Sequence, residues 1–145
     1  MAATGNSGNE RRSKTRDVID RLLAERRELL SLLFDSSSSD PVASVIERER
    51  LRDFCEILVD YIAAGHFGLY QRLSEGTERR AAVLEVADRV FPLIQSSTET
   101  AVEFSDYCEA NGYQRSDEIM TRLSGLAEDL SGRFELEDQI IEAMI

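Results

Sequence analysis

The residues best suited to bind a partner are acidic and aromatic side chains between positions 49 and 67. Four carboxylates recur at spacings of four, three and four, which puts them on one helix face: Glu49, Asp53, Glu56 and Asp60. Arg52 can reach Glu56, but no basic residue stands three or four positions from Asp60. Phe67 extends the same face beyond these acids. An acidic stripe that leads into an exposed aromatic residue suits a basic partner. From composition alone, however, a solvated acidic face is the favoured interpretation, and the partner surface is the alternative.

A second group of polar residues falls at or beside positions that the helical period assigns to the core. Its members are Asp20, Arg26, His66 and Glu137. A charge buried between helices must be paired, so these residues predict a shared internal network. A polar layer that fixes the register of the helices is favoured over a ligand site.

Groups that could do catalysis or hold a metal are few. His66 is the single histidine and has no acid three residues before it, so paired Glu-x-x-His metal motifs are not available. The chain has no glycine-rich phosphate loop. Cys55 and Cys108 lie on apolar stripes, where a thiol usually acts as a small hydrophobe, and a hydrolase that pairs one of them with His66 is a distant alternative. We predict no enzyme, no cofactor and no metal.

The elements that must position these residues are helices. Apolar residues spaced three and four positions apart predict four helices, over about 15–35, 42–73, 78–109 and 116–142. Asp40 before Pro41 is the expected start of the second helix, which continues through Gly65, and the third continues through Pro92. Asn111 with Gly112 is the expected end of the third helix. No stretch shows the sustained alternation of apolar and polar residues that is typical of a strand. The prediction is therefore an all-α, antiparallel four-helix bundle.

Composition narrows the classes of partner. The chain has 145 residues and a net charge of −11, which disfavours direct binding to nucleic acid. It contains neither an apolar run long enough for a membrane span nor the apolar core of a signal peptide, so we expect a cytoplasmic protein. Residues 1–14 are small, polar and basic and predict a flexible arm, leaving 15–145 as a single helical domain.

Three segments of the chain carry a family resemblance. The first runs from Ile19 through Arg26 to Leu30, the second from Asp53 to Arg72, and the third is Arg-Phe-Glu-Leu-Glu-Asp at 133–138. Together they resemble the Rsd/AlgQ family, bacterial anti-sigma regulators. The similarity is strong over 16–34, 51–73 and 122–142 and weak between the last two. One departure is Leu22, where the family usually carries Trp.

The resemblance implies a helical bundle that binds region 4 of the primary sigma factor. It implies that binding keeps sigma from core RNA polymerase and from promoter DNA, without catalysis. Under this hypothesis Asp53, Glu56 and Asp60 supply the charge, with Phe67 or Tyr61 as the anchor. The alternative is an adaptor that binds another regulatory protein, such as a phosphocarrier or a signalling enzyme, through the same bundle.

Overall fold

The computed structural model describes the backbone of residues 2–37, 44–74 and 80–145, and the side chains of 14–33, 48–71, 73 and 80–145. These residues form α1 (Ala2–Ser37), α2 (Ser44–Ala63), the π-helix η1 (Ala64–Tyr70), α3 (Gln71–Ser74), α4 (Ala81–Ala110) and α5 (Asp117–Met144). No strand occurs in the described ranges. The all-α prediction is therefore confirmed.

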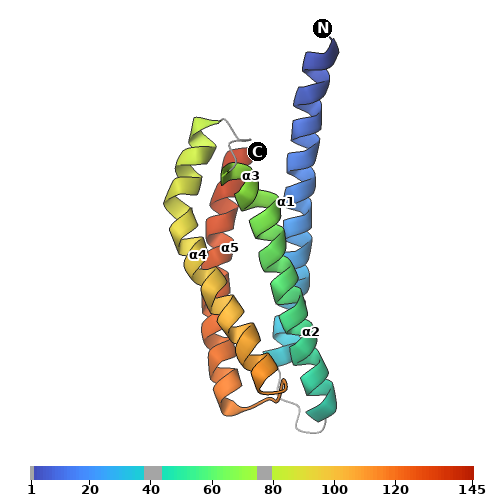
Figure 1. The fold of residues 1–145 in the computed structure, drawn as a ribbon, viewed down its shortest axis with the longest axis vertical. Coiled ribbons are helices and arrows are strands. Elements are labelled where there is room, and N and C mark those ends of the chain that lie inside the picture. The colour runs from blue at the N-terminus through green and yellow to red at the C-terminus, as the bar shows by residue number, and fades with distance from the viewer. Residues whose placement is uncertain (1, 38–43, 75–79) are drawn as a thin grey trace.

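The long helices lie side by side with alternating directions (Figure 1). In that view the chain runs down α1, up through α2, η1 and α3, down α4 and up α5. The closest packing joins α4 to α5 and α1 to α2, and α2 also packs on α4. Helices that follow one another in the sequence are thus neighbours, as short connections require.

The apolar stripes read from the sequence meet in one core. Fully buried side chains come from each long helix and include Leu22, Leu58, Val90 and Leu126. Leu22, at the position where the family usually has Trp, is 0% exposed and belongs to this core. A side chain of this size typically contributes about 1.5–3 kcal/mol when it is fully buried.

The described helix ends follow the predicted chemistry. The Ser116 hydroxyl accepts a hydrogen bond from the Ile119 amide (3.1 Å), which satisfies one free N–H of the first turn of α5. After α4 the chain reverses at Gly112, with φ 64°, and Tyr113, with φ 57°. Pro92 lies inside α4, which continues beyond it as expected. The predicted start at Asp40 and residues 75–77, which separate the second and third predicted helices, lie outside the described residues.

The predicted helix over 42–73 does continue through Gly65, but not as a regular α-helix. Residues Ala64–Tyr70 form a π-helix, in which each turn holds one residue more than an α-turn. The sequence pattern did not indicate this change, because apolar spacing fixes which residues face the core and not the number of residues in one particular turn.

The first helix begins earlier than expected. The backbone of residues 2–14, predicted as a flexible arm, is helical, and the first turns of α1 extend past the other helices (Figure 1). Once a helix is nucleated, each added residue costs little, so α1 can propagate beyond its packed part. Among the described side chains, the first core residue of α1 is Ile19.

A chain that begins at Thr15 should therefore fold as the full chain does. It keeps every described core residue and loses only turns that project from the bundle. Thermal melting of the two chains, followed by circular dichroism, should give midpoints within a few degrees of each other. A shorter chain without a cooperative transition would show that residues 1–14 stabilise the fold.

Candidate partner-binding surface and the buried network beneath it

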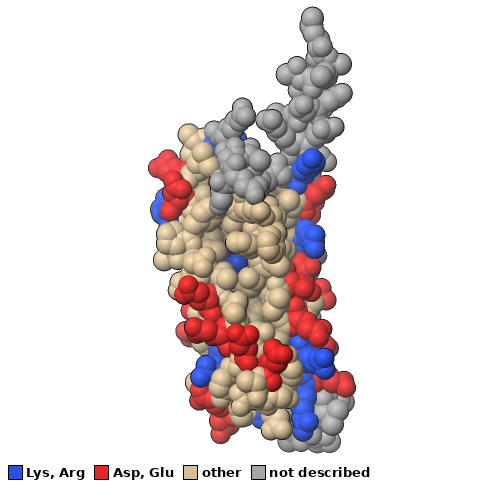
Figure 2. Space-filling view, in the orientation of Figure 1, with Lys and Arg blue, Asp and Glu red and all other residues tan. Residues whose placement is uncertain are grey.

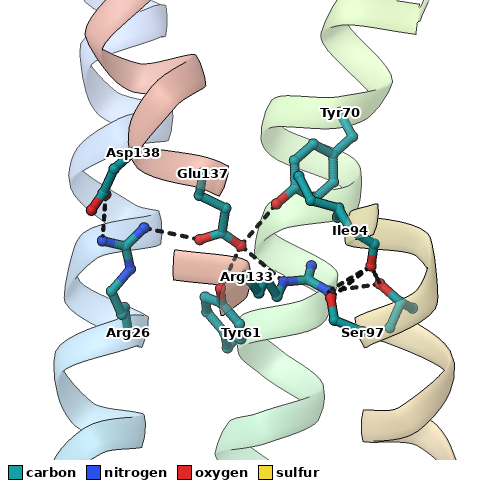
Figure 3. Close-up of polar contacts among 9 residues, drawn as sticks. Arg26, Tyr61, Tyr70, Ile94, Ser97, Arg133, Glu137 and Asp138 are labelled. Atoms are coloured by element: carbon teal, nitrogen blue, oxygen red, sulfur yellow. Dashed lines mark hydrogen bonds and ion pairs between the residues drawn. The ribbon is translucent and has the colours of Figure 1, made fainter. Parts of the chain in front are cut away.

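A single carboxylate, that of Glu137, occupies the centre of the bundle (Figure 3). Its side chain is 0% exposed. Oε1 accepts hydrogen bonds from the hydroxyls of Tyr61 and Tyr70 (2.8 Å for Tyr70) and from Nε of Arg133 (2.9 Å). Oε2 accepts from Nη2 of Arg26 (3.0 Å). Four donors from α1, α2, η1 and α5 thus converge on one side chain.

Two arginines extend this network to the remaining helix and to the surface. Arg133 is 1% exposed, and its Nη1 donates to the hydroxyls of Ser97 (3.1 Å) and Thr98 (2.7 Å) on α4. Arg26 donates from Nη1 to Oδ1 of Asp138 (2.7 Å). The two guanidinium groups face two carboxylates, so the formal charges of the network balance. This balance matters because an unpaired buried charge is costly.

Aromatic rings surround the charged groups. The Arg133 guanidinium carbon lies 5.3 Å from the Tyr61 ring centre and 5.7 Å from that of Tyr70, and that of Arg26 lies 4.9 Å from the Phe134 ring. Burial raises the pKa of both tyrosines, and the charge of Glu137 raises each further. Both phenols therefore stay protonated at neutral pH and act as donors to the carboxylate.

The sequence placed some of these residues correctly and others wrongly. Arg26 and Glu137 meet, as the internal-network hypothesis required. The structure puts His66 and Asp20 at the surface instead. The His66 ring packs edge-on against the Phe67 ring, with the two ring centres 4.9 Å apart. Tyr61, considered as a surface anchor, is 0% exposed and belongs to the network. These three residues lie at the edges of the apolar stripe of their own helix. The pattern of one helix cannot predict which edge is buried, because that depends on where the neighbouring helix packs.

Sequence reasoning missed Arg133 and Tyr70. Arg133 precedes Glu137 by four residues, a spacing that brings opposite charges together on one helix face. That signal was present in the sequence. Tyr70 gave no comparable signal, because nine residues of α-helix make about two and a half turns and would point it away from Tyr61.

The π-helix explains why Tyr61 and Tyr70 nevertheless reach the same oxygen. Its wider turn reduces the rotation between them, so both hydroxyls point at Glu137. Gly65 sits within this turn. A Cβ there would lie 3.0 Å from Cε2 of Tyr70 and 3.4 Å from Nη2 of Arg133. The glycine thus allows the backbone to approach the network closely.

The outer face of the same segment carries the predicted binding residues. Asp53, Glu56, Asp60 and Phe67 are all exposed, Phe67 by 67%. Arg52 pairs loosely with Glu56 (3.7 Å), whereas Asp60 has no ion pair with any residue whose side chain is described. Val59, 50% exposed, adds a second apolar side chain. We call these five residues, Asp53, Glu56, Val59, Asp60 and Phe67, the α2 surface.

A groove of about 430 Å³ runs along part of the α2 surface. Asp60, Ala64 and Phe67 line one side of it, and Arg21 and Glu25 of α1 line the other. The helices come close at this level, since a Cβ on Gly68 would lie 3.2 Å from Cγ1 of Val18. The groove therefore combines an unpaired acid with an exposed aromatic ring.

Charges are unevenly spread over the face that Figure 2 shows. Acidic side chains gather over the lower half of α4, and acidic and basic ones alternate along the edge where α1 and α2 lie. No group of His, Cys, Asp and Glu that could hold a metal ion occurs within the described part of the chain. Within the same part, no helix is long and apolar enough to cross a membrane.

Comparison with known proteins gives the chain its family. A family profile described as "Regulator of RNA polymerase sigma(70) subunit, Rsd/AlgQ" matches residues 1–145. The chain belongs to the Rsd/AlgQ family of sigma(70) regulators. It is also similar to proteins named "Regulator of sigma D" from Salmonella arizonae, Salmonella newport and Salmonella heidelberg. Each is 31% identical over 137 residues, which cover 91% of this chain and 84% of the relative.

The segments that resemble the Rsd/AlgQ family are those that build the buried network. Residues 16–34 supply Arg26, residues 51–73 supply Tyr61 and Tyr70, and residues 122–142 supply Arg133 and Glu137. The weakly matching α4 contributes only hydroxyl and carbonyl oxygens to Arg133. The described residues that bond directly to Glu137 thus all lie in the three segments that carry the resemblance.

Replacing Glu137 with Ala should destabilise the bundle by about 3–5 kcal/mol, because it leaves Arg133 buried without its carboxylate. Urea denaturation measures the loss. The matched control is Glu135→Ala, which removes an exposed acid from the same helix and should change stability by less than about 0.5 kcal/mol. Equal effects of the two substitutions would contradict the central role of Glu137.

The stability of the protein should also fall in alkali. Unfolded tyrosines lose their protons near pH 10, whereas the raised pKa values keep Tyr61 and Tyr70 protonated in the fold. Above about pH 10 the unfolded state then binds fewer protons, so the free energy of unfolding decreases as pH rises. The expected slope is about 1.4 kcal/mol per pH unit for each tyrosine.

Urea denaturation between about pH 8 and pH 11.5 tests this slope. Tyr70→Phe should lower the slope by about 1.4 kcal/mol per pH unit, because one buried phenol fewer then resists ionisation. A profile that stays flat above pH 10 in the parent chain would show that the two phenols ionise equally easily in the folded and unfolded states.

Proposed function

We propose that this regulator acts by binding region 4 of the primary sigma factor through the α2 surface. Binding there keeps sigma from core RNA polymerase and from promoter DNA, in the cytoplasm and without a catalytic step. The observation that carries the proposal is the groove that brings the exposed carboxylate of Asp60 beside an exposed ring, that of Phe67, in a member of a sigma(70) regulator family.

Charge complementarity supports region 4 as the partner. Region 4 contains a basic helix-turn-helix that otherwise faces DNA phosphates. A protein of net charge −11 attracts such a partner during diffusion, and exposed carboxylates can take the place of phosphates opposite its arginines. Attraction between exposed charges is screened by salt, so it governs how fast the partners meet more than how long they stay together.

The exposed ring of Phe67 supports a role in holding the partner after the two proteins have met. Phe67 and Val59 expose apolar surface that a partner helix would cover, and burying a side chain of this kind contributes about 1.5–3 kcal/mol. Large aromatic residues are common among the few positions that dominate binding energy. Phe67 thus acts as the anchor, while Asp53, Glu56 and Asp60 orient the basic partner around it.

Two substitutions on the α2 surface should weaken binding without unfolding the protein. Asp60→Ala should reduce affinity for an isolated region 4 fragment by about 5–30-fold, and Phe67→Ala by at least about 10-fold. Both side chains are exposed, so the melting temperature should change little. Calorimetric titration at low and high salt measures affinity, and the parent complex should weaken as salt rises.

The matched control is Asp88→Ala, which removes an exposed acid from α4, away from the groove. It should retain parental affinity. Absence of binding at low salt would overturn the sigma assignment. Equal losses in Asp60→Ala and Asp88→Ala would assign the effect to net charge and reject the α2 surface. A lower melting temperature in Asp60→Ala would show that Asp60 acts through the fold.

A further inference from the structure

Phe67 and Tyr70 belong to the same short π-helix, but only one of the two rings faces the core. Phe67 is 67% exposed and lines the groove, whereas Tyr70 is 8% exposed and donates a hydrogen bond to Glu137 (2.8 Å). In an α-helix, residues three positions apart are neighbours on one face. In that geometry the two side chains would lie on the same side and could not serve the surface and the core at once.

The π-geometry of η1 removes this conflict. The backbone N–H of Gln71 donates to the carbonyl of His66, which is five residues earlier instead of the four of an α-helix. Because this turn holds one residue more, a step of three residues falls further short of a full turn, which separates Phe67 from Tyr70 around the helix axis. The exposure of Phe67 and the bond from Tyr70 to Glu137 therefore depend on one turn.

Tyr70 is held on several sides (Figure 3). Its hydroxyl donates to Oε1 of Glu137 on α5. Its ring packs edge-on against Phe91 of α4, with the ring centres 5.5 Å apart. A Cβ on Gly65 would lie 3.0 Å from Cε2 of this ring, so the ring fills the space that the glycine leaves. These contacts tie the end of η1 to α4 and α5.

We propose that Tyr70 is a positioning residue for the partner anchor: its hydrogen bond to Glu137 keeps η1 in the π-turn that presents Phe67 to the groove. The Phe67 ring packs edge-on against His66, which belongs to the same turn and is also exposed, so the direction of Phe67 follows the turn. Without the bond, the segment returns to the far commoner α-turn, and Phe67 moves relative to the groove. The effect on binding rests on the proposed function, whereas the link between Tyr70 and Phe67 does not.

The first test uses the full chain without a partner. 4-Fluorophenylalanine placed at position 67 gives a fluorine NMR resonance that reports the surroundings of this ring. Tyr70→Phe should shift or broaden the resonance, because the turn that holds the ring is released. The matched control is Tyr61→Phe, which removes a hydroxyl from the same oxygen of Glu137 but lies in α2, before the π-turn. It should leave the resonance unchanged. Equal changes in the two variants, or no change in Tyr70→Phe, would overturn the link.

A second substitution tests the same link without removing a hydrogen-bonding group. Gly65→Ala adds a Cβ that would lie 3.0 Å from Cε2 of Tyr70 and therefore displaces its ring. The fluorine resonance at position 67 should change as it does in Tyr70→Phe. The control is Gly132→Ala on α5, where an added Cβ meets nothing within 4 Å, and this variant should keep the parental resonance. If Tyr70→Phe does not fold, this pair decides the question, and an unchanged resonance in Gly65→Ala contradicts the proposal.

Binding to the region 4 fragment is then measured as a double-mutant cycle. Tyr70→Phe should weaken binding about 3–10-fold in the parent chain, but by less than about 2-fold when Phe67→Ala is also present, because the anchor is then gone. Tyr61→Phe should change the affinity by less than about 2-fold. An equal loss from Tyr70→Phe in both backgrounds would show that it does not act through Phe67. A fragment that does not bind the parent chain would refute the proposed function, and the fluorine resonance would still decide whether Tyr70 positions Phe67.

Discussion

The fold depends on the carboxylate of Glu137 and the donors that surround it. Its two oxygens gather hydrogen bonds from Arg26 on α1, Tyr61 on α2, Tyr70 on η1 and Arg133 on its own helix. A buried carboxylate is expensive to remove from water, and only this full set of partners makes the position tolerable. The cost also gives specificity, because any sliding of one helix against another would leave a charge unpaired. An apolar core alone would not penalise such a shift as strongly.

The same requirement shapes the segment from Asp53 to Tyr70. Tyr61 and Tyr70 both reach Glu137 because η1 is wider than an α-helix, and Gly65 leaves room for the Tyr70 ring, to which a Cβ at this position would come within 3.0 Å. Asp60 precedes Tyr61 directly and Phe67 lies within η1. The positions of these exposed residues therefore follow from those of the buried network residues on the same segment. The buried network and the exposed α2 surface are two faces of one short stretch of chain.

This arrangement suits a protein that works by binding. The network ties α2 and η1 to α1 and α5, so under the proposed function the α2 surface has its arrangement before a partner arrives. Preorganisation of this kind reduces the entropy that association costs. Asp60 forms no ion pair with any residue whose side chain is described, so under the proposed function its charge is available to a basic partner, whereas Arg26 and Arg133 pair with Glu137 and Asp138 inside the bundle.

The sequence by itself determined the helices, most of their described ends, and the stripes that form the core, because these follow from local spacing and from capping residues such as Ser116. It also determined that Arg26 and Glu137 needed partners, and that Asp53, Glu56, Asp60 and Phe67 stood outside the apolar stripe. Only the tertiary structure decided that Tyr61 points inward while His66 and Asp20 point outward. It alone revealed the π-turn that brings Tyr70 to Glu137. Each of these depends on contacts between residues far apart in the chain, and local periodicity carries no information about which neighbouring helix covers the edge of a stripe.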